Sequence, residues 1–250
     1  MAPNKREREY ERRRYEKWQQ RQATRNARRR RQRALAAVLV GALVIGIGIT
    51  AAVTLWDDGA DDQAASDLGA SDAATKDSLV PDPALAQGRT WTGTLATNQG
   101  DIAFELDGAA APQAVANFVS LAGDAYFDGT SCHRLVTSGI HVLQCGDPTA
   151  TGTGGPGYTW GPIENAPADN VYPAGTIAMA RTAGDGSSMG SQFFLVYEDS
   201  TIPSDAAGGY TVFGRITSGL DVVQAIADAG NGADGVAPAL DVIIEGVETQ

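Results

Sequence analysis

The chain has 250 residues and a formal net charge of −11 at pH 7, and its length suits one large domain or two small ones. It contains only two histidines and two cysteines, which excludes a His-rich metal site and would require all four side chains for a Cys/His zinc site. The charge is uneven: residues 1–33 carry 14 Lys and Arg against 4 Glu, a net of +10, so residues 34–250 carry −21.

An uncharged apolar segment separates these two charge regions. Residues 34–56 contain no charged side chain, and at about 1.5 Å per helical residue they can cross the roughly 30 Å hydrocarbon core of a bilayer. A cleavable signal sequence usually has an apolar region of only about 7–15 residues. The segment is therefore predicted to be a permanent transmembrane helix.

The flanking charges indicate the orientation of this helix. Lys and Arg clusters stay on the cytoplasmic side; arginines 28–31 and Arg33 precede the segment, whereas Asp57 and Asp58 follow it. We expect residues 1–33 to form a cytoplasmic arm that contacts membrane lipid, with the C-terminal part outside the cytoplasm. Nucleic-acid binding by the arm is the alternative, but topology and lipid attraction explain the same residues, so no nucleic-acid partner is predicted.

A second composition change follows the apolar segment. Residues 57–87 contain eight Asp, one Lys and no aromatic side chain, too little apolar surface to offset the entropy of ordering the chain. They are predicted to be an acidic, disordered linker, and the folded domain is predicted to comprise residues 88–250.

Residues 88–250 show the pattern of a β-rich domain. Apolar and polar residues alternate on both sides of a turn at residues 98–100, which predicts an antiparallel hairpin over residues 91–106. Pro112 opens a predicted helix, and a second helix is predicted over residues 220–229. Further strands are predicted at 132–136, 141–145, 175–180, 191–197, 210–216 and 240–244. Short strands, two helices and Gly-rich loops favour a closed antiparallel barrel.

Several segments are specific enough to indicate a family. They are NFVSLAGDAYFDGTSCHR (117–134), CHRLVTSGIHVLQCGDPTATGTGGPGYTW (132–160), GTIAMAR (175–181), GSQFFLVY (190–197) and YTVFG (210–214). In this order the series resembles the cyclophilin-type peptidyl-prolyl cis-trans isomerases, and with the N-terminal anchor it resembles a bacterial membrane-anchored form. The resemblance implies a mainly β fold: a closed eight-stranded antiparallel barrel with two helices, preceded here by one transmembrane helix.

The resemblance also assigns site residues. The implied catalytic residues are Arg134, Gln144 and Phe194. The implied substrate-binding residues are His141, Val142, Ala180, Arg181, Gln192, Ile202 and Tyr210. From the residues alone, a salt-bridge partner is the favoured interpretation of Arg134, and an exposed residue near a hairpin tip is the favoured interpretation of His141.

Some of these positions depart from the usual pattern of the family. His141 and Val142 replace a Phe-Met pair, Tyr210 replaces a His, and Arg181 replaces an Asn. The usual Trp-Leu pair is matched by Thr201 and Ile202. These departures bear on substrate range and rate more than on the fold.

The implied chemistry requires no nucleophile, metal or cofactor, and none is predicted. An isomerase of this kind has only to bind a twisted prolyl amide more tightly than a planar one. The Arg134 guanidinium stays charged and would donate to the prolyl nitrogen, while Phe194, Val142 and Ile202 would contact the proline ring. Proline-containing polypeptides are the predicted partners.

Two other chemistries are disfavoured by local sequence. The stretch TGTGGPG (151–157) lacks the Lys-Ser/Thr of a phosphate-binding loop and has Pro156 where a helix should begin. No GxSxG motif supports a Ser-His-Asp hydrolase.

The two cysteines allow two outcomes. An extracytoplasmic location permits a Cys132–Cys145 disulfide. However, the resemblance places Arg134 and Gln144 on one face of adjacent strands, so Cys132 would share that face and Cys145 would point the other way. We expect free thiols, although a bulge in the connection would change this parity.

The leading hypothesis is a peptidyl-prolyl cis-trans isomerase that assists the folding of exported proteins. The alternative is a proline-binding chaperone or docking module with little turnover, and only a rate measurement separates the two. A purely structural role leaves the combination of Arg134, Gln144 and Phe194 unexplained.

Overall fold

The computed structural model describes residues 79–250. The predicted arm (1–33), the predicted transmembrane helix (34–56) and residues 57–78 of the predicted linker lie outside the described residues. Within residues 79–250, no helix combines the length and apolar character that a membrane crossing requires.

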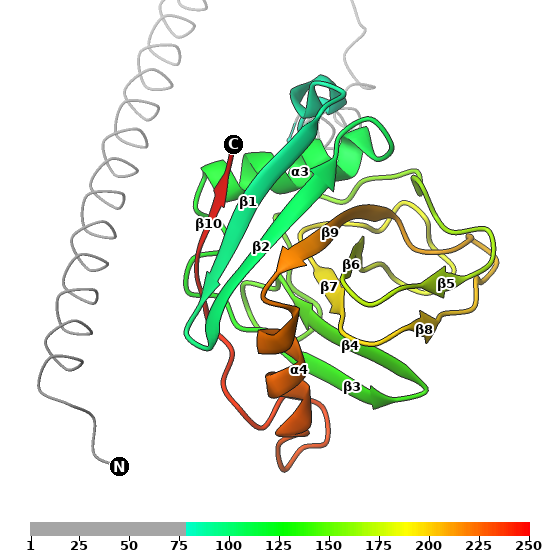
Figure 1. The fold of residues 1–250 in the computed structure, drawn as a ribbon. Helices are drawn as coiled ribbons and strands as arrows, with labels where there is room; N and C mark the ends of the chain where they lie inside the picture. The colour runs from blue at the N-terminus through cyan, green and yellow to red at the C-terminus, as the bar shows by residue number, and fades with distance from the viewer. Residues whose placement is uncertain (1–78) are drawn as a thin grey trace, which may run out of the picture. The chain divides into compact units, whose positions relative to one another are not determined.

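The domain is built on one antiparallel sheet of eight strands, in the order β10-β1-β2-β9-β6-β7-β4-β3 (Figure 1). The strands are β1 (Thr90–Thr97), β2 (Gly100–Asp107), β3 (Arg134–Ser138), β4 (Ile140–Cys145), β6 (Thr176–Met179), β7 (Phe193–Val196), β9 (Val212–Ser218) and β10 (Ile244–Thr249). Two short strands, β5 (Val171–Tyr172) and β8 (Ser200–Thr201), pair with each other. The predicted 91–106 hairpin is confirmed as β1 and β2, whereas the last strand begins at Ile244, where the sequence pattern placed its end.

Both predicted helices are confirmed, as α3 (Pro112–Gly123) and α4 (Leu220–Asp228). Phe118 of α3 lies at the centre of the core, within 5.7 Å, ring centroid to ring centroid, of four other phenylalanines. These are Phe104, Phe127, Phe193 and Phe213. Helix α3 packs against β10, and α4 packs against β2 and β9.

The folded domain starts earlier than residue 88. The 3-10 helix η1 (Pro83–Ala86) packs against α3. Ala86 is buried, and its carbonyl accepts a hydrogen bond from Trp91 Nε1 at 2.9 Å. Gln113 Nε2 donates to the carbonyl of Pro81 at 2.9 Å. Residues 81–87 therefore belong to the domain, because their backbone groups bind its side chains.

The predicted closed barrel is corrected to an open, strongly curled sheet. Its edge strands β10 and β3 share no ladder, and an isolated bridge between Ser131 and Ile243 joins the segments that precede them. The Cys132 N–H donates to the Val242 carbonyl at 2.9 Å, and the Ile244 N–H donates to the Thr130 carbonyl at 2.8 Å. The two edges approach each other through irregular backbone, so the ladder stops short of closure.

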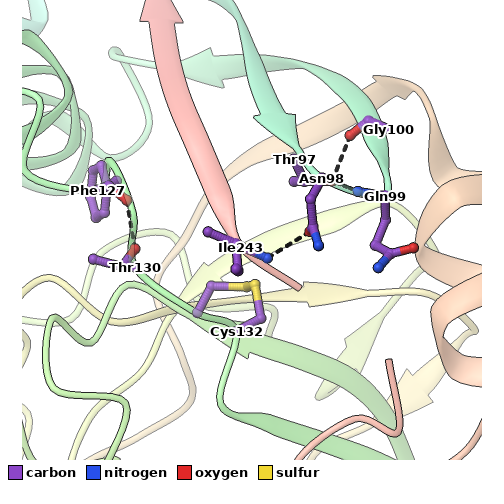
Figure 2. The surroundings of a disulfide bond; sticks show 9 residues. Thr97, Asn98, Gln99, Gly100, Phe127, Thr130, Cys132 and Ile243 are labelled. Carbon is purple, nitrogen blue, oxygen red and sulfur yellow. Dashed lines mark hydrogen bonds between the residues drawn. A yellow bond between two sulfur atoms is a disulfide. The ribbon is translucent and has the colours of Figure 1, made fainter. Parts of the chain in front are cut away.

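The expectation of free thiols is wrong: Cys132 and Cys145 form a disulfide. Both cysteines are buried in the main core. Figure 2 shows the bond beside Ile243, whose N–H donates to Asn98 Oδ1 at 2.8 Å.

The prediction of free thiols, which assumed regular strand alternation, failed because the β3 ladder does not extend back to Cys132. Strand β3 begins at Arg134, and the Cys132 N–H bonds to Val242 rather than to β4. Beyond Cys145, Gly146 adopts a φ of 86°, which bends the chain out of β4. Strict alternation holds only within a regular strand, so Cys132 is free to face the core.

The disulfide should be detectable and stabilising. The intact mass under nonreducing conditions should be lower than the reduced mass by two hydrogens. The double variant Cys132→Ala/Cys145→Ala should lose about 3 kcal/mol of unfolding free energy in chemical denaturation, because a closed loop of this size constrains the unfolded chain. Two titratable thiols in the denatured, unreduced protein would contradict the disulfide.

Candidate active site

One row of side chains crosses five adjacent strands of the sheet. Arg134 pairs with Gln144, Gln144 with Phe194, Phe194 with Ala178, and Ala178 with Val212. Residues directly opposite each other in antiparallel strands project from the same face. The strand register therefore places the three predicted catalytic residues side by side.

An apolar cluster, separate from the main core, occupies the same face as this row. We call it the outer apolar cluster. Its buried members are Val142, Tyr172, Ala178, Phe194, Val196 and Ile202, and its partly buried members are Val136, Ile140, Ala180, Tyr210 and Val212. Five predicted site residues belong to it: Val142, Ala180, Phe194, Ile202 and Tyr210.

The polar site residues form a hydrogen-bonded chain along the edge of this cluster. Arg134 Nη1 donates to Gln144 Oε1 at 3.3 Å, and Gln144 Nε2 donates to Gln192 Oε1 at 2.8 Å. Arg134 is exposed, and no carboxylate among residues 79–250 forms an ion pair with it. The guanidinium is thus oriented by a neutral amide and keeps donors for a ligand.

His141 does not join the other predicted site residues. It pairs with Thr137 on β3, one residue out of phase with Val142, so it projects from the opposite face of β4. Its ring packs edge-on against Tyr197, with centroids 5.6 Å apart, and its Nε2 lies 3.9 Å from Glu198 Oε2. The structure therefore places the His141 side chain on the face of β4 opposite the Arg134–Gln144–Phe194 row.

The Arg181 side chain is also unavailable to a ligand. Its guanidinium binds both carboxylate oxygens of Asp205, each at 2.9 Å. Its other N–H groups donate to the carbonyls of Thr182, Gly208 and Gly209. All five donors of the guanidinium are thereby used, and the side chain is only 1% exposed. The substrate contact predicted for Arg181, through backbone groups near Ala180 and Arg181, does not involve this side chain and stays a prediction.

Arg181 instead supports one wall of the outer apolar cluster. Its guanidinium lies 4.7 Å from the ring centroid of Tyr210, a favourable cation–π arrangement. The Tyr210 ring packs edge-on against Phe194, and the Tyr210 N–H donates to Tyr172 Oη at 2.8 Å. The hydrogen bonds from Arg181 hold the pKa of the Asp205 carboxyl below its ordinary range.

Two hollows flank the Arg134–Gln144 pair. One, of about 440 Å³, is lined by Gln144, Gln192, Ala180 and Arg181 together with residues 152–156. The other, of about 570 Å³, is lined by Arg134, Gln144 and the loop that contains Asp234 and Pro238. Gln144 and Gly152 line both hollows. A ligand that crosses the Arg134–Gln144 pair therefore has space on either side of it.

The Gly-rich stretch 151–157 binds a carboxylate of its own chain. Asp147 is fully buried and accepts hydrogen bonds from Thr149, Gly152 and Gly154. Burial alone would raise the pKa of Asp147, but the hydrogen bonds from Thr149, Gly154 and Gly152 outweigh it and lower that pKa to about 2. Asp147 is therefore ionised at neutral pH.

Sequence analysis missed several members of the site. Val136 and Ile140 could have been found, because they lie two residues from Arg134 and Val142 and strand alternation places each pair on one face. Tyr172 and Asp205 gave no such signal, since they come from segments without periodicity. Among residues 79–250, no three His, Cys, Asp or Glu side chains gather as a metal site.

Comparison with known proteins identifies the family. The family described as cyclophilin type peptidyl-prolyl cis-trans isomerase/CLD matches residues 92–249. The chain therefore belongs to the cyclophilin-type peptidyl-prolyl cis-trans isomerase family.

Individual relatives match over different lengths. The probable peptidyl-prolyl cis-trans isomerase B of Mycobacterium leprae is 44% identical over 178 residues, 66% of this chain and 57% of that protein. Peptidyl-prolyl cis-trans isomerase B of Bacillus subtilis is 41% identical over 134 residues, 53% of this chain and 88% of that protein. The chain thus spans little more than half the length of the M. leprae protein.

A solved structure is similar in fold and sequence. The cyclophilin type peptidyl-prolyl cis-trans isomerase of Cryptosporidium parvum, crystallised in the presence of the dipeptide Ala-Pro, has a TM-score of 0.55 and 28% identity. The match covers 64% of this chain and 98% of that one.

The Arg181–Asp205 ion pair should matter more for stability than a surface pair. Arg181→Ala should lower the thermal midpoint by roughly 4–8 °C, because it removes the hydrogen bonds to the Asp205 carboxylate and to the carbonyls of Gly208 and Gly209. The matched control is Arg215→Ala, which removes an exposed pair with Glu105 and should change the midpoint by only about 1–2 °C. Equal shifts in calorimetry would contradict a supporting role for Arg181.

Proposed function

We propose that this chain is a peptidyl-prolyl cis-trans isomerase that acts on proline-containing polypeptides. The observation that carries the proposal is the Arg134–Gln144–Phe194 row, which places at the edge of an apolar cluster a guanidinium that has no carboxylate partner within residues 79–250. The Ala-Pro dipeptide in the C. parvum relative supports a proline-containing ligand.

The outer apolar cluster suits the proline ring. Three of its residues, Phe194, Val142 and Ile202, are 3–7% exposed. Each therefore keeps a small apolar surface that a ligand can contact. A pyrrolidine ring placed there buries apolar area on binding. The remaining peptide extends into the hollows on either side of Gln144.

Catalysis then consists of binding the twisted amide more tightly than the planar one. Rotation about a peptide bond costs about 18–20 kcal/mol because amide resonance is lost. In the twisted state the prolyl nitrogen recovers its lone pair and can accept a hydrogen bond. Arg134 supplies the donor, and this bond forms only in the transition state.

The required energy is modest. A thousandfold acceleration corresponds to about 4 kcal/mol of preferential binding. A charged donor held at the developing lone pair supplies much of this amount. Gln144 contributes by accepting from one Arg134 nitrogen, which limits the orientations of the guanidinium.

The proposal predicts turnover that depends on Arg134. The full chain, purified in mild detergent, should accelerate cis-trans exchange of an Ala-Pro peptide, measured by NMR exchange spectroscopy. Arg134→Ala should reduce the rate by about 100-fold or more. The thermal midpoint should be unchanged, because Arg134 is exposed. Arg215→Ala is the matched control and should keep the wild-type rate.

The outcomes separate the candidate functions. If the wild-type chain binds the peptide but the exchange rate equals that of buffer, the protein is a proline-binding module without turnover. If Arg134→Ala keeps the full rate, another donor performs the reaction and the mechanism is wrong.

We further propose that the enzyme is membrane-anchored and assists proteins that fold after export. The support is the uncharged segment 34–56, the basic residues before it and the acidic residues after it. The Cys132–Cys145 disulfide supports the same location, since disulfides persist in oxidising compartments. The acidic linker would separate the domain from anionic headgroups.

This location predicts protease sensitivity from outside the cell membrane. With the full chain expressed in a bacterial host, protease added to intact spheroplasts should degrade the C-terminal domain and leave an N-terminal epitope protected. A cytoplasmic host enzyme is the control and should stay intact until lysis. Protection of the C-terminal domain until lysis would contradict the proposed orientation.

A further inference from the structure

The buried carboxylate of Asp147 organises the loop that leads away from β4. Its Oδ1 accepts from the N–H and the hydroxyl of Thr149 at 2.7 and 2.8 Å. Its Oδ2 accepts from the N–H groups of Gly152 and Gly154 at 2.6 and 3.0 Å. A Cβ on Gly154 would overlap Asp147 Oδ1, so the loop wraps the carboxylate too closely for any side chain there.

The same loop sets the orientation of Gln192. The carbonyls of Gly152 and Gly154 accept from Gln192 Nε2 at 3.1 and 2.9 Å. Both amide hydrogens of Gln192 are thereby used, and its Oε1 faces Gln144 Nε2.

The direction of these side-chain hydrogen bonds determines which group of Gln144 faces Arg134. A glutamine amide has one accepting and one donating end. Because Gln144 donates to Gln192, its oxygen faces Arg134 Nη1. If Gln192 turned over, its NH2 group would face the NH2 group of Gln144. Gln144 would then turn as well and present a donor to the guanidinium, and Arg134 would lose its acceptor.

We propose that Asp147 is a positioning residue: through the Gly152–Gly154 loop, Gln192 and Gln144, it fixes the orientation of the Arg134 guanidinium. This inference rests on the proposed isomerase activity, because the guanidinium matters for rate only if the chain isomerises prolyl bonds.

Asp147 is itself held firmly at the base of the loop. Its backbone forms a bridge with Ser131, and it follows Cys145, whose disulfide ties β4 to the segment before β3. A Cβ on Gly146 would overlap the Ser191 carbonyl oxygen, so only glycine allows this bend. The carboxylate thus has a fixed position from which to hold the loop.

The test is Asp147→Asn, a nearly isosteric change that places an NH2 group against the N–H donors of the loop. The rate at saturating Ala-Pro peptide should fall about 10- to 100-fold, since small displacements of a catalytic group have effects of this size. The peptide Kd, measured by calorimetry, should change less than twofold, because the outer apolar cluster is untouched.

The matched control is Asp107→Asn. Asp107 also accepts two backbone N–H bonds, from Ala109 and Ala110, but it has no link to the site, so the rate should be unchanged. Gly154→Ala is a second variant that disturbs the loop without altering Asp147, and it should reproduce the loss of rate if Asp147→Asn does not fold.

A double-mutant cycle distinguishes positioning from a general structural role. In an Arg134→Ala background, Asp147→Asn should cause no further loss of rate. An equal loss in both backgrounds, or a loss that appears in the Kd rather than the rate, would overturn the proposal.

A wild-type chain without turnover would contradict the proposed function but not this geometry. The side-chain NH2 resonances of Gln144 and Gln192 then provide the test, in NMR spectra of the full chain. Both should shift in Asp147→Asn and stay unchanged in Asp107→Asn. If neither shifts in Asp147→Asn, the positioning role is wrong.

Discussion

The pairing of β4 with β3 on one side and β7 on the other is the constraint on which the site depends. A slip of β4 by one residue would turn Gln144 toward the core and separate it from Arg134 and Phe194. The register is held from the opposite face, where Leu135 pairs with Leu143 and Leu143 with Leu195. These leucines are at most 2% exposed. The row from Arg134 to Phe194 therefore derives its strand register from apolar packing one residue away. Hydrogen bonds between its polar side chains then set their orientation.

The sequence predicted those parts of the fold that follow strict periodicity. Alternation located the first hairpin, and the spacing of apolar residues located both helices. Prediction failed where the backbone leaves a regular strand: at Cys132, which lies before the β3 ladder begins, and at the sheet edges, which do not close. His141 lies apart from the other predicted site residues, because matching residues one by one did not take into account which face of β4 each residue occupies. Asp205 was not foreseeable, since its role depends on a loop contact distant in sequence.

Two departures from the usual residues of the family explain each other. A tyrosine at position 210 presents a ring face, and an arginine at position 181 covers it. The arginine brings a charge into a site 1% exposed, which is tolerable only because Asp205 and three carbonyls satisfy it. Arg181 therefore supports the Tyr210 ring, which packs edge-on against Phe194.

Charge explains why amides, and not carboxylates, orient Arg134. Residues 88–250 contain four arginines against 18 Asp and Glu, so carboxylate partners are abundant in this domain. A carboxylate at position 144 would bind the guanidinium in a bidentate pair and occupy the donors that a prolyl nitrogen requires. The neutral Gln144 takes one donor and does not itself compensate the positive charge. Asp147, the nearest charge on the hydrogen-bonded chain, acts through two amides and a loop, and can set the orientation of Arg134 without neutralising it.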